Sequence, residues 1–259
     1  MAKLNKASAQ PFRMGWLPDL PDARDFQYAA PLKVMMKLPS KTDLRSKCPP
    51  VYNQGHLGSC TANALSGAFQ YGQKKQGKAT FMPARLFLYY NERVLINTTA
   101  SDSGAYIRDG IKSLNVDGIC KETLWPYNES QFAVKPNAAC YKEALQSQIL
   151  SYQRLTNSIN TLKGCLADGY PFVFGFTVYD SFMTAKVAKS GIMPMPDYSK
   201  EKVVGGHAVM GAGYDDSKQA FLIRNSWGKG WGIGGYFWMP YAYATSTVAN
   251  DFWTIRTVE

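Results

Sequence analysis

One cysteine stands at a position where its thiol could act as a nucleophile. Cys60 ends the Gly-rich stretch QGHLGSC and opens the helical pattern CTANALSGAFQYGQKK, which stops at Gly77. The N-terminus of a helix lowers the pKa of a thiol, because its unpaired N–H groups and its dipole favour negative charge. The loop glycines Gly55 and Gly58 allow a tight bend and let another chain approach the backbone closely. The spacing therefore predicts a reactive thiolate at Cys60.

A thiolate is stabilised by a nearby imidazole, and the chain holds two histidines. His207 lies in VVGGHAVMGAGYDD, where a strand pattern begins after a glycine pair. His56 lies four residues before Cys60 in the same loop, so we expect an exposed side chain that does not pair with the thiol. Two separated histidines and no paired-cysteine spacing give no cluster of metal ligands. We therefore expect His207 to be the partner of Cys60, with no metal and no cofactor.

Three motifs in this order resemble the papain family of cysteine peptidases. QGHLGSC is similar to the active-site loop of that family, GGHAVMGAGY to its histidine strand, and LIRNSWGKGWGIGGY to its Asn-Ser-Trp-Gly signature. His207 and Asn225 follow Cys60 by 147 and 165 residues, and the family spacing is about 130–150 residues. The longer second separation fits a longer loop around PMPDYSKEK. The resemblance extends from about Leu38 to the C-terminus.

The resemblance implies a role for each matching residue. Cys60 would attack the scissile carbonyl and form an acyl-enzyme, and His207 would hold the thiolate and then protonate the leaving amine. Asn225 would orient the imidazole, and Trp227 would cover the His207–Asn225 bond. The Gln54 side-chain amide and the Cys60 backbone N–H would form the oxyanion hole.

The resemblance also implies which residues border a substrate cleft. The stretch SDSGAYIRDGIKSLNVDGI is similar to the one whose glycines form a cleft wall, where the backbone would pair with an extended peptide. The expected substrate-binding residues are Gly58, Ser59, Ser103, Gly104, Ala105, Gly206 and Trp227. Three positions depart from the family pattern, namely Leu57 in place of a disulfide cysteine, Thr61 after the nucleophile and Gly206 before the histidine. None of them performs the bond-breaking step, so we expect activity to survive.

The segments around these motifs differ in kind along the chain. From about residue 50 to residue 148 the patterns are mainly helical, with a second helix from Pro83 through ARLFLYYNERV and a third across AYIRDGIKSLNV. From about residue 149 to residue 259 come strand-like runs, and the turn Asp215-Asp216-Ser217 joins two of them as a hairpin. This order predicts an α+β protein. The resemblance implies a papain-like fold, with a helical left subdomain, an antiparallel β-barrel-like right subdomain and the active-site cleft between them.

Residues 1–37 are expected to form an extended arm, because they hold several prolines and no sustained period. Residues 38–259 would form the peptidase domain, with residues 38–49 as a strap on its β part. The long α-helical propeptide of classical family members has no counterpart here, so the arm could cover the cleft and restrain access to it. A strap that only stabilises the β half is the alternative. The arm together with LGSCTANAL resembles the divergent bacterial, archaeal and viral branch that includes xylellain-like enzymes.

Composition limits the classes of partner. The net charge is +10, but the basic residues are scattered and the tightest cluster, Lys74, Lys75 and Lys78, ends a predicted helix. We therefore expect no nucleic acid, while acidic substrates or partners stay open. No apolar run approaches the ~18 residues of a membrane span. The basic start MAKLNKASAQPFRMGW lacks the apolar core of a secretory signal, which leaves a cytoplasmic protein and a processed secreted protein both open. We expect a monomer.

The four remaining cysteines leave the redox compartment open. Cys48, Cys120, Cys140 and Cys165 could all be free or could form up to two bridges. Cys120 and Cys140 flank a loop rich in Pro and Asn and are the more plausible pair. Cys165 lies in the helical pattern INTLKGCLADG and is expected to be a small buried apolar residue.

The leading interpretation is a cysteine endopeptidase that cleaves extended peptides or proteins through a thioester. A transpeptidase or an amidase could use the same site, because a Cys-His-Asn site alone does not select water over an amine as acceptor. A binding protein with the same fold is the third interpretation. The joint presence of Gln54, Cys60, His207 and Asn225 argues against it, because a protein that only binds has no need of all four.

Overall fold

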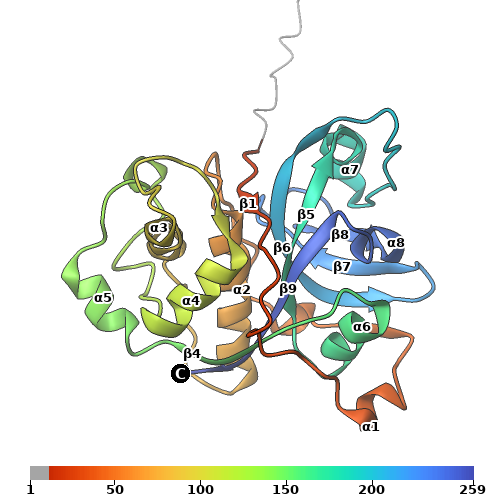
Figure 1. Cartoon of the computed structure of the whole chain (residues 1–259), viewed down its shortest axis with the longest axis horizontal. Coiled ribbons are helices and arrows are strands. Elements are labelled where there is room, and N and C mark those ends of the chain that lie inside the picture. The colour runs from red at the N-terminus through yellow and green to blue at the C-terminus, as the bar shows by residue number, and fades with distance from the viewer. Residues whose placement is uncertain (1–11) are drawn as a thin grey trace, which may run out of the picture.

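The structure divides into a helical half and a β half, which meet along the helix that begins at Cys60 (Figure 1). The computed structural model describes residues 12–259. The helical half is built from α2 (Cys60–Lys75), α3 (Arg85–Leu95), α4 (Ile107–Val116), the 3-10 helix η2 (Glu129–Gln131) and α5 (Ala138–Ala144). This is the α+β arrangement of two unlike halves that the sequence predicts.

Within the described residues, the β half is a seven-stranded sheet whose neighbouring strands run antiparallel. The strand order is β4-β9-β5-β6-β7-β8, and β2 pairs with β6 off this path. The strands are β2 (Lys41–Asp43), β4 (Ile149–Arg154), β5 (Phe172–Tyr179), β6 (Val203–Asp215), β7 (Ala220–Arg224), β8 (Tyr236–Pro240) and β9 (Ala249–Val258). The short helices around them are η1 (Arg45–Lys47), α6 (Ile159–Ala167), η3 (Asp180–Met183), α7 (Ala185–Ser190) and α8 (Tyr241–Ala244).

The long strand β6 is buried on both faces and separates two hydrophobic cores. Ala208, Met210 and Ala212 pack with α2 in the first core, whereas Val209 packs in the core of the β half. This alternation follows the period of two of a strand. His207, one position before Ala208, is therefore held on a strand that is fixed from both sides.

Helix α2 is buried on nearly all of its faces, because it lies between the two halves. Polar residues such as Thr61 and Asn63 are buried along it together with apolar ones such as Leu65 and Phe69. A helix packed from all sides loses the single apolar stripe of a surface helix. The helix ends just before Gly77, whose φ is 68°, as the sequence predicts.

Two predicted helix starts are wrong by two residues. Helix α3 begins at Arg85 and not at Pro83, because Pro83 forms an isolated antiparallel bridge with Lys121. Helix α4 begins at Ile107 and not at Ala105, because residues 105–106 form the short strand β3 (Ala105–Tyr106). In both cases a tertiary strand contact replaces the first half-turn that the local pattern favours.

All five cysteines are free thiols, which is one of the alternatives that the sequence leaves open, and Cys120 and Cys140 are in contact with each other. The Cys140 thiol donates to the carbonyl of Leu124 at 3.8 Å. Cys165 is fully buried within α6, as predicted. Across residues 12–259, no helix has the length and apolar character that would let it cross a membrane.

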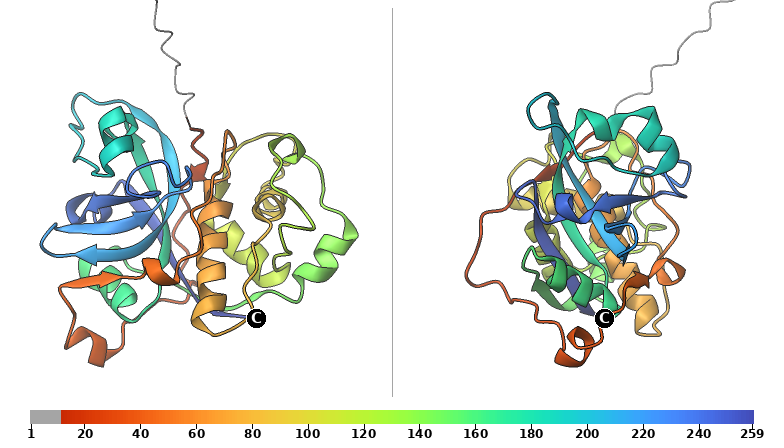
Figure 2. Two further views of the ribbon diagram at one scale, coloured as in Figure 1. Left: turned by 180° about the vertical axis from the view of Figure 1, so that it is seen from behind. Right: turned by 90° about the vertical axis from the view of Figure 1, so that its right-hand side faces the viewer.

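The predicted arm runs along the boundary between the two halves (Figure 1). Strand β1 (Trp16–Leu17) pairs with β3 in parallel, and the chain then follows β4, where the N–H of Tyr28 donates to the carbonyl of Arg154. It continues through α1 (Leu32–Met35) and along the outside of the β half into β2 (Figure 2). The first eleven residues of the arm lie outside the described part of the chain.

Candidate active site

Backbone contacts join the Gly-rich loop to the segment that follows β7. The N–H of Gln54 donates to the carbonyl of Ser226 at 2.9 Å, and Asn53 forms an antiparallel bridge with Trp227. The loop belongs to the helical half and the segment to the β half. These contacts therefore place two of the predicted motifs side by side at the boundary between the halves.

His207 and Asn225 meet because β6 and β7 are paired in the sheet. His207 Nε2 donates to Asn225 Oδ1 at 2.8 Å, and the imidazole stacks on Trp227 with the ring centroids 4.7 Å apart. Burial lowers the pKa of His207 to about 4, although the bond to Asn225 acts in the opposite direction. His207 Nδ1 is buried, and no group within residues 12–259 hydrogen-bonds to it.

Cys60 is the first residue of α2 and is fully buried. Burial raises the pKa of its thiol to about 12, against the opposing effect of the backbone N–H groups of Ala208 and Gly15 that approach the sulfur. The contact with Ala208 places the sulfur beside the strand that carries His207. In this closed arrangement burial favours the neutral forms of both the thiol and the imidazole.

The Gln54 side chain is held at both ends of its amide. Its Oε1 accepts from the Ser226 hydroxyl at 2.6 Å, and its Nε2 donates to the carbonyls of Leu57 at 2.9 Å and Arg13 at 3.2 Å. The bond from Ser226 fixes which end of the amide points toward the cleft. Ser226, the serine of the Asn-Ser-Trp-Gly signature, thus contacts the predicted oxyanion-hole residue.

Residues 12–15 of the arm lie directly over these groups. Phe12 stacks on Trp227, with the ring centroids 4.4 Å apart and an interplanar angle of 5°. The Arg13 carbonyl accepts a hydrogen bond from the Gln54 side-chain amide, and the backbone N–H of Gly15 approaches the Cys60 sulfur. A Cβ on Gly15 would lie 1.7 Å from the carbonyl oxygen of Gly58, so only glycine fits at this crossing.

Trp16 fills a pocket of the β half beside the histidine strand. A Cβ on Gly175 would lie 1.9 Å from its ring, and a Cβ on Gly206 would lie 2.4 Å from its carbonyl oxygen. Its indole Nε1 donates to Asp251 Oδ2 at 3.2 Å, and the backbone N–H of Asp19 donates to the same oxygen at 2.8 Å. Two glycines thus make room for the indole, and a carboxylate lies at the far end of the pocket.

Buried ion pairs hold the part of the arm that follows Trp16. Arg108 of α4 contacts Asp25 and, at 3.7 Å, Asp19, while Arg154 of β4 contacts Asp25 at 3.4 Å and Asp251 at 2.8 Å. Three carboxylates share two guanidinium groups. Burial raises the pKa of Asp19 to about 7, the charge of Asp251 acts in the same direction, and the charge of Arg108 opposes both. The closed arm therefore favours the protonated form of Asp19.

The arm also contacts the predicted cleft wall. The N–H of Ala105 donates to the carbonyl of Gly15 at 2.8 Å, and Gly104, with a φ of 75°, would carry a Cβ only 2.2 Å from that carbonyl oxygen. Asp102, which the sequence analysis does not single out, accepts from the N–H of Gly58 at 2.9 Å and from Arg13 at 2.8 Å. Nothing in its local sequence distinguishes it from an ordinary loop acid.

Two of the predicted substrate-binding residues hydrogen-bond to residues of the helical half. The Ser59 hydroxyl lies 2.6 Å from the Tyr127 hydroxyl, and the Ser103 hydroxyl lies 2.7 Å from that of Thr98. His56 is exposed and lies 3.3 Å from Glu129, away from Cys60, in agreement with the loop position that was expected. Within residues 12–259, no group of three or more His, Cys, Asp or Glu side chains could hold a metal ion.

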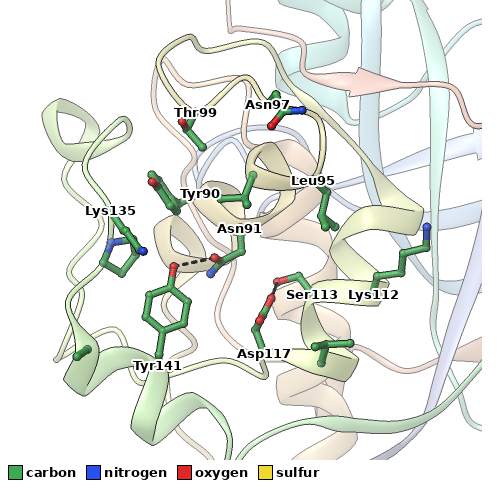
Figure 3. A pocket seen from close by; sticks show the side chains of 14 residues that line it. Tyr90, Asn91, Leu95, Asn97, Thr99, Lys112, Ser113, Asp117, Lys135 and Tyr141 are labelled. Carbon is green, nitrogen blue, oxygen red and sulfur yellow. Dashed lines mark hydrogen bonds between the residues drawn. The ribbon is translucent and has the colours of Figure 1, made fainter.

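A large cavity lies elsewhere, between α3, α4 and the segment around α5 (Figure 3). It measures about 1050 Å³, and its lining includes Tyr90, Lys112, Lys135 and Tyr141. None of the predicted catalytic or substrate-binding residues lines it. The candidate site is instead the arm-filled boundary between the two halves.

Comparisons with known proteins agree with this arrangement. The family model described as papain family cysteine protease matches residues 38–254. An uncharacterized peptidase C1-like protein of Acanthamoeba polyphaga mimivirus is 46% identical over 216 residues, covering 80% of this chain and 69% of that protein. The crystal structure of xylellain, a cysteine protease from Xylella fastidiosa, superposes with a TM-score of 0.90 at 44% identity and covers 95% of this chain and 96% of that one. A digestive procathepsin L 3 of Tenebrio molitor shares the fold at 19% identity, with a TM-score of 0.69, over 88% of this chain and 72% of that one.

Proposed function

Because the chain belongs to the papain family of cysteine proteases, we propose that it is an endopeptidase that forms an acyl-enzyme on Cys60. The observation that carries this proposal is the His207–Asn225 bond under Trp227, beside a thiol at the start of α2. Water would be the acceptor of the acyl group, and the substrates would be extended peptide segments of proteins.

Each group has a defined part in the proposed reaction. The Cys60 thiolate attacks the scissile carbonyl carbon, and the Gln54 amide with the Cys60 backbone N–H stabilises the oxyanion. His207 Nδ1 then gives its proton to the leaving amine as the C–N bond breaks. In the second half, His207 takes a proton from water, which attacks the thioester and releases the thiol. Asn225 Oδ1 keeps the imidazole in one orientation throughout.

We further propose that the arm restrains access to this site in the intact chain. The Arg13 carbonyl accepts the Gln54 hydrogen bond that an oxyanion would need, and Gly15 lies over the sulfur of Cys60. Strand β1 runs parallel to β3, so the arm uses the backbone donor of Ala105 that a bound peptide would otherwise meet. An intact chain must move residues 12–16 before a substrate can bind.

Turnover of a panel of fluorogenic peptides under reducing conditions tests the chemistry. We expect the full chain to cleave at least one of them and Cys60→Ala to cleave none. Cys48→Ala is the matched control, because Cys48 is a half-buried thiol away from the site. Equal loss in both variants would point to a folding defect, and persistent cleavage by Cys60→Ala would refute the assignment of the nucleophile.

A further inference from the structure

The loop that carries both predicted oxyanion donors is fixed by a buried arginine of α3. Arg85 is 5% exposed, and its Nε and Nη2 each donate to the Glu122 carboxylate at 2.9 Å. Its Nη1 donates to the carbonyl of Asn53 at 3.1 Å and to Asn63 Oδ1 at 3.0 Å. The guanidinium thus bonds both to the peptide just before Gln54 and to the helix that begins at Cys60.

Tyr127 also hydrogen-bonds to this loop, at the peptide that follows Gln54. Its hydroxyl donates to the carbonyl of Gln54 at 2.8 Å and lies 2.6 Å from the Ser59 hydroxyl, and its ring packs on the Arg85 guanidinium at 4.2 Å. Asn63 Nδ2 donates to the carbonyl of Ser59 at 2.9 Å. The carbonyls of residues 53, 54 and 59 are therefore each bonded to a side chain of this network.

We propose that Arg85 and Tyr127 are positioning residues for the oxyanion hole, a role that rests on the proposed function. The Gln54 amide and the Cys60 N–H lie at the two ends of the loop to which Arg85 and Tyr127 hydrogen-bond. A hole works only if its donors lie about 2.7–3.1 Å from the developing oxyanion. The five cysteines of the chain are all free, so no disulfide fixes this loop.

This arrangement separates the geometry of the oxyanion hole from the reactivity of the thiol. Neither Arg85 nor Tyr127 hydrogen-bonds to His207 or Asn225 in the described residues. Peptide cleavage passes through an oxyanion, whereas alkylation of Cys60 by iodoacetamide is a direct displacement at carbon that forms none. Both reactions need an open cleft, so the ratio of their second-order rate constants is independent of the arm.

The test is Tyr127→Phe in the full chain, which removes the two hydroxyl contacts and keeps the ring on Arg85. We expect kcat/KM for a fluorogenic peptide to fall at least tenfold, through kcat, with the alkylation rate of Cys60 within about twofold of the parent. The fall should stay short of the 10²–10³ loss that removal of an oxyanion donor causes. Tyr141→Phe is the matched control, since the Tyr141 hydroxyl donates to Asn91 Oδ1 at 2.8 Å within the helical half. We expect it to leave both rates unchanged.

Arg85→Lys gives a second measurement, because lysine keeps the charge but lacks the planar fork that reaches Glu122, Asn53 and Asn63 together. We expect folded Arg85→Lys to show the same loss of kcat, with the alkylation rate of Cys60 unchanged. A parallel fall of cleavage and alkylation in Tyr127→Phe, or unchanged kcat, would overturn the positioning role while leaving the peptidase assignment intact. A parent chain that alkylates at Cys60 but cleaves no peptide would overturn the proposed function and this inference with it.

Discussion

Trp16→Ala should open the cleft, because the side chain contributes only to the closed arm. Trp16 is 6% exposed in its pocket and would lie in water once the arm leaves. Replacing a buried aromatic residue by alanine costs about 3–5 kcal/mol. This loss destabilises only the closed state, and each 1.4 kcal/mol or so changes the equilibrium constant between the closed and open states by a factor of about ten. The open fraction should therefore rise by roughly 10² to a few thousandfold, up to the point where the chain is fully open.

Alkylation of Cys60, followed by the mass of the modified peptide, measures this fraction directly. We expect alkylation and peptide turnover to rise together in Trp16→Ala, because both require removal of residues 12–16. Leu20→Ala is the matched control, since Leu20 lies in the same arm and is 85% exposed. If both variants react at the rate of the parent chain, the arm does not limit access and the proposed restraint is wrong.

Four further predictions follow from the same contacts. Gly15→Ala should also speed alkylation, because its Cβ would lie 1.7 Å from a backbone oxygen; an unchanged rate would contradict the observed crossing. Burial raises the pKa of Asp19 to about 7 in the closed chain, so the stabilisation of the closed arm by this carboxyl is complete below the ordinary pKa of an aspartate, near 4, and is lost as the pH rises through 7. Over this pH range, alkylation of Cys60 should therefore accelerate more in the parent than in Asp19→Asn. Identical pH profiles of the two proteins would exclude a role of this carboxyl. Ser226→Ala should lower kcat about tenfold at constant alkylation rate, since it frees the Gln54 amide to turn; equal losses in both rates would argue for a wider disturbance. Asn225→Ala should lower both rates, because the imidazole that stabilises the thiolate loses its orientation, and a selective loss of cleavage alone would contradict that role.

The three motifs could be located in the sequence because each lies within a short local pattern. A glycine loop before a helix, a glycine pair before a strand and the Asn-Ser-Trp-Gly run each define one element end, and the paired β6 and β7 bring two of them together. The alternation of Ala208, Val209 and Met210 between the two cores likewise follows from the period of a strand. Such features depend on neighbours in sequence, so the sequence alone suffices to find them.

The contacts of the arm could not be predicted in this way. Trp16 and Asp251 are 235 positions apart in the chain, and their bond exists only because β9 passes beneath the pocket that Trp16 enters. Asp251 gives no local sign of this, and neither does Arg85, which resembles any first-turn residue of a helix. Cys120 and Cys140 are a different case, because loop composition indicated the pair and the structure brings the two free thiols into contact.

The closed arrangement favours one protonation state of the predicted catalytic pair, because both groups are fully buried in it. Burial raises the pKa of the Cys60 thiol and lowers that of the His207 imidazole, so it favours the neutral pair over the thiolate–imidazolium pair. Conversion to the thiolate–imidazolium pair moves a proton within the site and takes none from solvent, so that step by itself has no net pH dependence. The pH dependence of opening must then come from groups outside the pair. The buried carboxylates that hold the arm, with Asp19 shifted farthest toward neutrality, are placed to supply it.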